Sequence, residues 1–255
     1  MFPLDPRGGH NRYKFNKDFF KTWTPEMAYV LGFMYADGDI EDNRKSSRTQ
    51  YTTFASTDKE ILEAIKKVMN SSHNLNYRAA HNVTYKNGKT YRSKGIYRLR
   101  IGSKEMYEDL LKLGLTPRKS LTIEFPKNIP NQYLNHFIRG YFDGDGCVTI
   151  MRGRGKKDQP ILKGIAIIFT SGSKIFLEEL CKRVHESSNF SIRNIYSSSR
   201  AYSLKYPTSE SVEFFKFLYG NKKSDLFLKR KFNIFAHYFQ LRPMRKDKII
   251  EGMLK

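Results

Sequence analysis

Two stretches of the chain repeat one pattern: Ala28-Tyr-Val-Leu-Gly-Phe-Met-Tyr-Ala-Asp-Gly38 and Phe137-Ile-Arg-Gly-Tyr-Phe-Asp-Gly-Asp-Gly146. Each is an apolar run that ends in Asp-Gly. Small residues recur at four-residue spacing, which places them on one side of a helix. They are Ala28, Gly32, Ala36, Gly140 and Gly144. Because small side chains let helix backbones approach closely, the pattern predicts two helices packed together through these positions.

The end of each stretch combines a glycine with an acid. Gly38 and Gly146 can adopt the left-handed conformation that closes a helix C-terminus, so both helices are predicted to stop there. Asp37 and Asp145 then lie beside the negative end of a helix dipole, where a carboxylate is repelled. If the helices pair in parallel, two carboxylates and two negative ends converge, and oxygen ligands of this kind suit a hard cation such as Mg2+.

The overall charge indicates a polyanionic partner. The 255 residues include 46 Lys and Arg against 25 Asp and Glu, which gives a net charge of +21. Nucleic acid is the first candidate and an anionic membrane the second, but the basic residues are not gathered on one amphipathic helix. The apolar runs are too short to span a bilayer and the first ten residues do not resemble a signal peptide. We therefore expect an intracellular protein, in the cytoplasm or nucleoid of a bacterium or phage host or in an organelle.

Cysteine and histidine usage adds little chemistry. Cys147 and Cys181 are interpreted as reduced core residues, which fits a reducing compartment. The six histidines lack the spacing of a zinc site.

The order of predicted elements repeats along the chain, with Asp145 lying 108 positions after Asp37. Each half is predicted to run α-β-β-α-β-β-α, which indicates an α+β fold of two pseudo-symmetric half-domains. The predicted boundaries are a basic N-terminal arm (1–23), a first half-domain (24–125), a linker (126–130), a second half-domain (131–240) and a basic C-terminal tail (241–255).

Alternation in the predicted strands places basic side chains on one face of a sheet. In the strand predicted from Thr90 to Ile101, Arg92, Lys94, Arg98 and Arg100 fall on the face opposite Tyr97, Leu99 and Ile101. A strand of about ten residues spans roughly 33 Å, so two halves could cover about twenty base pairs of double-stranded DNA. Polar and basic residues of the predicted strands and loops are therefore the candidate DNA contacts. They are Arg44, Arg48, Gln50, Thr52, Arg78, Lys86, Lys89, Arg92, Lys94, Arg98, Arg100, Arg152, Arg154, Lys156, Lys157, Lys163, Arg193, Tyr196, Ser198, Arg200, Tyr202 and Lys205.

The repeated stretches resemble the twin signature of the LAGLIDADG homing endonucleases in their single-chain form. The matching segments are Val30–Gly38 and Ile138–Gly146, specific at the small residues, the penultimate acid and the terminal glycine. Tyr35 stands where the family often has another acid, and Arg139 is a charged residue near the start of the second helix. The acids that the family associates with metal binding are the ones matched by Asp37 and Asp145.

This resemblance implies a fold and a chemistry. The signature helices would pair at the centre, and two antiparallel sheets would form a DNA-binding saddle in a monomeric protein. Asp37 and Asp145, with Ala36 and Gly144 beside them, would hold Mg2+, with Mn2+ as a substitute and Ca2+ supporting binding without turnover. Each strand would be hydrolysed to leave 3′ overhangs. The family also has a peripheral basic residue in each half, which we expect among Arg118-Lys119 and Lys222-Lys223, with Lys119 and Lys223 favoured.

Two classes of function remain at this point. The first is a site-specific double-strand DNA endonuclease, favoured because both acids are present at the duplicated helix ends. The second is a binding protein on the same scaffold, either a non-cleaving DNA-binding regulator or a maturase that binds group I intron RNA.

Overall fold

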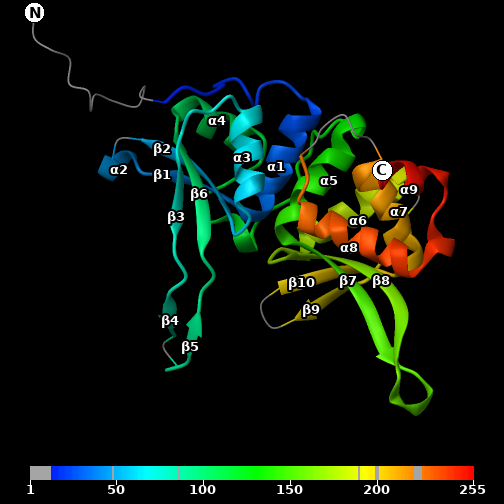
Figure 1. The fold of residues 1–255 in the computed structure, drawn as a ribbon. Coiled ribbons are helices and arrows are strands. Elements are labelled where there is room, and N and C mark those ends of the chain that lie inside the picture. The colour runs from blue at the N-terminus through cyan, green and yellow to red at the C-terminus, as the bar shows by residue number, and fades with distance from the viewer. Residues whose placement is uncertain (1–12, 48, 86, 189, 199–200, 221–225) are drawn as a thin grey trace, which may run out of the picture. The chain divides into compact units, whose positions relative to one another are not determined.

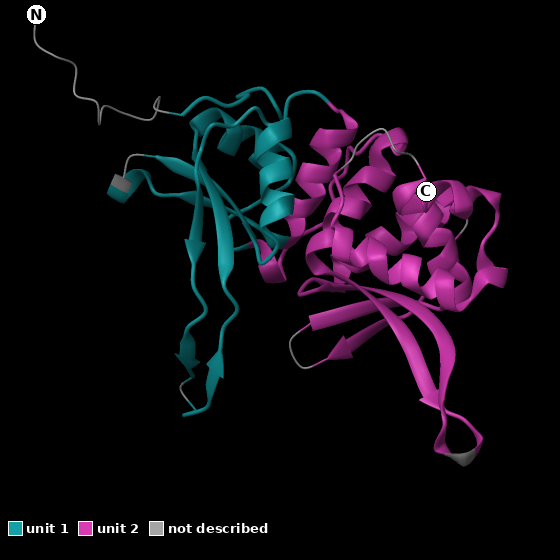
Figure 2. Cartoon of the chain, in the orientation of Figure 1, with its two compact units in different colours: residues 1–22, 37–118 teal, residues 23–36, 119–255 magenta. Residues whose placement is uncertain are grey.

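The computed structural model describes residues 13–255 except 48, 86, 189, 199–200 and 221–225. Contacts divide the chain into two compact units, residues 1–22 with 37–118 and residues 23–36 with 119–255 (Figure 2). The first signature helix therefore belongs by its packing to the unit that contains the second signature helix.

Unit 1 is built on an antiparallel sheet with helices on one face (Figure 1). Its strands in spatial order are β1 (Gly38–Asp42), β2 (Gln50–Ser56), β6 (Ile96–Gly102) and β3 (Leu75–Arg78). A two-stranded extension consists of β4 (Asn82–Thr84) and β5 (Thr90–Arg92). The helices are α2 (Arg44–Ser47), α3 (Lys59–Val68) and α4 (Lys104–Lys112). The strand predicted from Thr90 to Ile101 is interrupted, because β5 and β6 occupy its two ends. Gly88, just before β5, has φ +78°.

Unit 2 repeats this order and adds helices at its end. Its sheet runs β7 (Gly146–Arg154), β8 (Pro160–Ser171), β10 (Ala201–Tyr206) and β9 (Ile195–Ser198), all antiparallel. The helices are α1 (Pro25–Asp37, whose last residue falls in unit 1), α5 (Asn131–Asp145), α6 (Lys174–Ser188), α7 (Thr208–Tyr219), α8 (Lys229–Leu241) and α9 (Lys248–Met253). Short 3-10 turns are η1 (Lys119–Leu121), η2 (Lys156–Asp158) and η3 (Pro243–Arg245). The structure thus has the predicted α+β repeat with two open antiparallel sheets.

The centre of unit 2 is the contact between α1 and α5. A Cβ on Gly32 would lie 2.0 Å from the carbonyl oxygen of Phe137, and one on Gly140 would lie 2.0 Å from that of Tyr29. The contact is reciprocal, since each glycine faces the residue three positions before the other glycine. Both helices are buried along most of their length. Only glycine permits this backbone-to-backbone approach.

The helix ends differ from the sequence prediction. Gly146 has φ −87° and ψ 159°, which is extended backbone. Gly38 is likewise a strand residue, paired with Phe54. The prediction of left-handed caps is therefore wrong: each signature helix runs directly into the first strand of its half. At Gly146 the absence of a side chain has another cause, because a Cβ would lie 2.2 Å from the ring of Phe142.

Both the N-terminal arm and the C-terminal tail contain buried apolar side chains. In the N-terminal arm, Phe19 and Phe20 are buried, and the part before residue 13 lies outside the described residues. The basic tail forms η3 and α9, in which Ile250 and Met253 are buried. Cys181 is buried as predicted, but Cys147 is exposed on β7, so the interpretation of Cys147 as a core residue is wrong.

Candidate functional site

The face of the unit 1 sheet opposite its helices is cationic. Along β6, Leu99 and Ile101 are fully buried, whereas Arg98 and Arg100 are exposed. The Arg100 guanidinium lies 3.8 Å from the centre of the Tyr51 ring and pairs with Glu41 at 2.7 Å. The alternation predicted for this strand is present.

In strand β2, the candidate DNA contacts Gln50 and Thr52 lie on the face of the sheet that is covered by the helices. Thr52 is fully buried and Gln50 is 5% exposed, because the even-numbered residues of β2 point toward the helices with Phe54. Tyr51 and Thr53 share the other face. The assignment of Gln50 and Thr52 as DNA contacts is therefore corrected.

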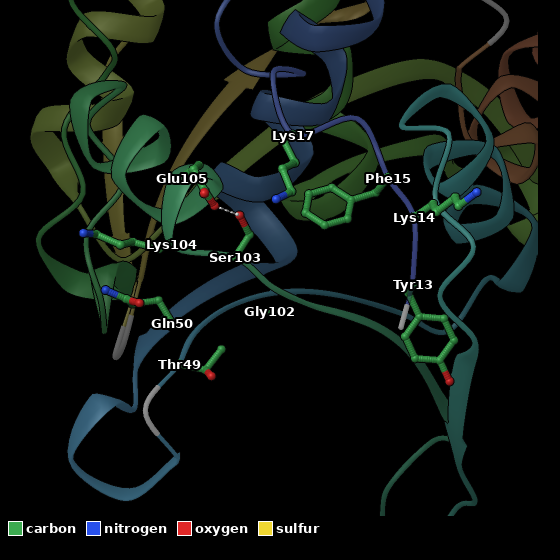
Figure 3. A pocket seen from close by; sticks show the side chains of 10 residues that line it. All are labelled: Tyr13, Lys14, Phe15, Lys17, Thr49, Gln50, Gly102, Ser103, Lys104 and Glu105. Atoms are coloured by element: carbon green, nitrogen blue, oxygen red, sulfur yellow. Dashed lines mark hydrogen bonds between the residues drawn. The ribbon is translucent and has the colours of Figure 1, made fainter. Parts of the chain in front are cut away.

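Gln50 instead lines a cavity of about 570 Å³ in unit 1. Figure 3 shows how the segment that carries Tyr13 and Phe15 bounds this cavity on one side, and Lys14, Lys17 and Lys104 also line it. The segment is attached by backbone hydrogen bonds, of which Ser72 N to Lys14 O measures 2.8 Å. Tyr13 also contacts the ring of His73, with centroids 4.8 Å apart. Several lysine side chains therefore lie around this cavity, at the ends of strands of the unit 1 sheet.

Other basic candidates in unit 1 follow β3, β4, β5 and the connections between them. These residues are exposed: Arg78, Lys89, Arg92 and Lys94. Arg44 is also exposed but is bound by Asp42 at 2.6 Å. Arg48 and Lys86 lie outside the described residues.

In unit 2 the cationic face is formed by β7, β8, β9 and β10. Exposed candidates are Arg152, Arg154, Lys156, Lys163, Tyr196, Ser198 and Lys205. Lys157 lies in η2, and Arg200 falls outside the described residues.

Two unit 2 candidates are corrected by their surroundings. Tyr202 has the same strand phase as the buried Leu204 and so lies on the helix-facing side of the sheet. Arg193 is bound to Glu210 through both Nε (2.9 Å) and Nη2, which engages its guanidinium within the unit.

The signature acids are accessible. Asp37 and Asp145 are exposed and are the last residues of α1 and α5, whose preceding turns are buried. In the part of the chain that the structure describes, no group of three or more His, Cys, Asp or Glu side chains is close enough to hold a metal.

A nearly buried lysine lies at the end of each signature helix. Lys119 is 6% exposed, and its Nζ donates to the carbonyl oxygen of Ala36 at 3.4 Å. Lys231 is 3% exposed, and its Nζ donates to the carbonyl oxygen of Gly144, also at 3.4 Å. Ala36 and Gly144 each precede a signature acid, so the two lysines hold equivalent positions in the two halves.

Lys231 was missed by the sequence analysis, which favoured Lys223. Lys223 lies outside the described residues. Lys231 is the third residue of α8, at the end of a Lys-Arg-Lys run with no feature that distinguishes it in sequence. The position that matches Lys119 can be recognised only from the contact with Gly144.

Arg139 and Asp143 form a buried polar group on α5. Arg139 is 1% exposed and donates to the carbonyl oxygens of Leu218 (2.7 Å) and Leu226 (2.9 Å). Asp143 is 2% exposed, and its Oδ2 accepts from the Tyr29 hydroxyl at 2.7 Å. Burial raises the pKa of Asp143 to about 6, although the hydrogen bond from Tyr29 and the charge of Lys231 act in the opposite direction.

A family model for the LAGLIDADG-like domain matches residues 24–113 and 132–201, one repeat in each half. The chain belongs to the LAGLIDADG family. The matched ranges include both signature helices, with Asp37 at the end of the first and Asp145 at the end of the second.

Solved LAGLIDADG structures share the fold at low sequence identity. The homing endonuclease I-WcaI bound to its DNA recognition sequence has a TM-score of 0.53 and 15% identity, covering 86% of this chain and 91% of that one. The LAGLIDADG meganuclease I-AabMI bound to uncleaved DNA has a TM-score of 0.55 and 13% identity, covering 90% and 95%. I-DmoI in complex with DNA and Ca has a TM-score of 0.50 and 15% identity, covering 84% and 94%. No curated protein matches the chain.

None of the helices in the described residues combines the length and hydropathy that crossing a bilayer requires.

Proposed function

We propose that this LAGLIDADG protein is a site-specific double-strand DNA endonuclease that uses a divalent metal, with Mg2+ as the expected ion. The observation that carries the proposal is the matched pair of helix ends, each with an exposed acid and a nearly buried lysine on the preceding carbonyl. Solved relatives of the same fold are described as bound to DNA, one of them with Ca, which supports the substrate class and a divalent ion.

The donor chemistry fits a hard cation. Asp37 and Asp145 supply carboxylate oxygens, which Mg2+ and Ca2+ prefer. The carbonyls of Ala36 and Gly144, assigned to the metal from sequence, each accept from a lysine ammonium. We therefore assign the metal to the carboxylates. A bound divalent ion activates water and stabilises charge on the attacking and leaving oxygens of the phosphodiester.

The lysines have an electrostatic role in this proposal. Each helix C-terminus carries about half a negative charge, and a carboxylate stands beside it. The Lys119 and Lys231 ammonium groups offset this charge, so that a DNA phosphate can approach the acids at a lower electrostatic cost. The exposed arginines and lysines of the two sheets supply the phosphate and base contacts that hold the duplex. Cleavage would leave 3′ overhangs.

The test is a cleavage selection from a randomised duplex library with Mg2+, run beside a binding selection with Ca2+. A single long site cut on both strands is the expected result. Specific binding without any cut would instead favour the non-cleaving regulator, and selective binding of structured RNA would favour the maturase.

Substitution at the acids tests the residue assignment. Asp37→Asn and Asp145→Asn should each reduce double-strand cleavage by more than about 100-fold, because each removes a negatively charged ligand of the divalent ion that activates water and stabilises charge on the phosphodiester oxygens. DNA binding in Ca2+ should largely persist. Asp18→Asn is the control, since Asp18 is an exposed acid outside both signatures. Wild-type cleavage by either signature variant would remove the proposed metal site.

A further inference from the structure

Lys231 contacts the end of α5 from a helix, α8. In the described residues of the first half, Lys119 lies instead in the short 3-10 turn η1. The Lys231 Nζ donates to the carbonyl oxygens of Phe142, Asp143 (2.9 Å), Gly144 (3.4 Å) and Gly146 (2.6 Å). These acceptors outnumber the three N–H bonds of an ammonium group, so the lysine is enclosed by the last turn of α5.

Arg139 holds both ends of the connection that leads to this helix. Leu218 lies in the last turn of α7 and Leu226 lies just before α8. The guanidinium donates to both of their carbonyl oxygens, Nη1 to one and Nε to the other. The Arg139 side chain of α5 therefore binds the backbone both at the end of α7 and just before α8.

Asp143 binds the backbone of the residue that caps the start of α8. Leu228 is the N-cap of α8, and its backbone N–H donates to Asp143 Oδ2 at 2.8 Å. A carboxylate at the positive end of a helix is also favoured by the helix dipole. The first turn of α8 is thus attached to α5 at two points, through Leu228 N and through Lys231 Nζ.

Stability alone gives a poor reason for this arrangement. A buried carboxylate is costly unless its oxygens are hydrogen-bonded, and Asp143 Oδ1 has no hydrogen-bond partner among the described residues. Burial also opposes the charge of the Arg139 guanidinium and lowers its pKa. Arg139 and Asp143 instead hold the backbone just before α8, and so determine where this helix begins.

We propose that Arg139 and Asp143 are positioning residues that hold the Lys231 ammonium at the end of α5, next to Asp145. The proposal rests on the proposed function in one respect, that Lys231 takes part in cleavage. Misplacement of an active-site group by about 1 Å can cost about 100-fold in rate. Because Lys119 lies at the end of α1 and Lys231 at the end of α5, displacement of Lys231 should slow one DNA strand more than the other.

The experiment compares four variants of the full chain. Asp143→Leu and Arg139→Met remove one attachment each, since neither new side chain has a hydrogen-bonding oxygen or nitrogen. Lys231→Met removes the lysine itself. Ser211→Ala is the matched control, because Ser211 is fully buried in the same unit and its hydrogen bonds to Tyr206 O and from Ile167 N involve no residue of α8. Each variant is assayed below its melting temperature, by single-turnover cleavage with the two strands labelled separately.

The expected result is a strand-selective defect. Asp143→Leu and Arg139→Met should slow the same strand as Lys231→Met by at least about 10-fold and accumulate nicked duplex. Ser211→Ala should lower the melting temperature without strand bias. The double variant Asp143→Leu with Lys231→Met should be no slower than Lys231→Met alone, because the residues act through one group. Equal slowing of both strands, or additive losses in the double variant, would overturn the proposal.

A second measurement needs no cleavage activity. Reductive methylation followed by peptide mass spectrometry reports the accessibility of each lysine amine. Lys231 should be protected in the wild type and in Ser211→Ala, and should become reactive in Asp143→Leu and Arg139→Met. If the wild type cuts no DNA, the proposed function fails, while this labelling still decides the positioning. Continued protection of Lys231 in both variants would refute it. If Arg139→Met does not fold, Tyr29→Phe, which removes one of the two hydrogen bonds to Asp143 Oδ2, provides the milder variant.

Discussion

The contact between α1 and α5 makes a quantitative prediction at Gly140. An alanine Cβ there would lie 2.0 Å from the Tyr29 carbonyl oxygen and 2.8 Å from the Phe33 nitrogen. Both are backbone atoms within a buried helix, so no side chain can rotate away. The first distance is roughly 1.4 Å short of the 3.4 Å at which ordinary contact begins, and the helices must separate to accommodate it.

Two terms of opposite sign determine the size of the effect. Alanine is favoured over glycine in a helix by about 1 kcal/mol. Overpacking in a rigid core costs about 1–3 kcal/mol and occasionally more, and contact with backbone on both sides puts Gly140 at or beyond the upper end. We expect Gly140→Ala to lower the free energy of unfolding by about 2 kcal/mol or more, which corresponds to a fall of about 4–8 °C in melting temperature for a chain of this size.

The assay is thermal unfolding beside a matched glycine. Gly252 lies in α9, and a Cβ there would meet nothing within 4 Å. Gly252→Ala should therefore stabilise the protein by up to about 1 kcal/mol through helix propensity alone. If Gly140→Ala melts at or above the temperature of Gly252→Ala, the helices do not make the close contact described here.

Further predictions concern the sheet of unit 1 and the segment packed on His73. Arg98→Ala should remove one phosphate contact, and so weaken DNA binding and reduce the salt dependence of the binding constant by about one ion. Arg100→Ala should have a smaller effect, because Arg100 already pairs with Glu41. Titration of DNA binding against salt measures both variants, and an unchanged affinity and salt dependence in Arg98→Ala would mean that this face does not bind DNA. Burial lowers the pKa of His73, with a further contribution from the charge of Lys66. The unfolded chain therefore binds this proton more tightly, so stability should fall as the pH drops from about 6.5 through the lowered folded value, and this fall should be absent in His73→Gln when melting temperatures are compared across that range.

The repeated signature could be predicted from sequence because close packing leaves a direct mark on composition. Gly32 and Gly140 are required by backbone contacts, and no other residue type can replace them at 2.0 Å. The clear alternation of Arg98 and Arg100 with Leu99 and Ile101 likewise fixed the phase of β6. The family resemblance and the repeat of elements followed from such local patterns.

Strand β2 shows where this reasoning fails. The sequence of β2 is polar on both faces, so it does not indicate which side chains point toward the helices. Thr52 was therefore assigned to the wrong face of the sheet. Its hydroxyl is buried and has no hydrogen-bond partner among the described residues, an arrangement that composition does not predict. Arg139 and Asp143 were visible in sequence as charged residues within a helix signature, but their partners Leu218, Leu226 and Leu228 are backbone groups 79 to 87 residues away.

The two nearly buried lysines follow their preceding helices at different distances along the chain. Lys119 follows the last residue of α4 by seven positions, through a turn in which Gly114 and Arg118 have positive φ, and its own carbonyl is fixed by hydrogen bonds from Thr122 and Ile123. Lys231 follows the last residue of α7 by twelve positions. A longer connection loses more conformational entropy when its end is held in one place. In addition, α8 must begin at Lys229 for its third residue, Lys231, to contact α5. In the positioning proposed above, Arg139 and Asp143 on α5 supply that constraint in the second half.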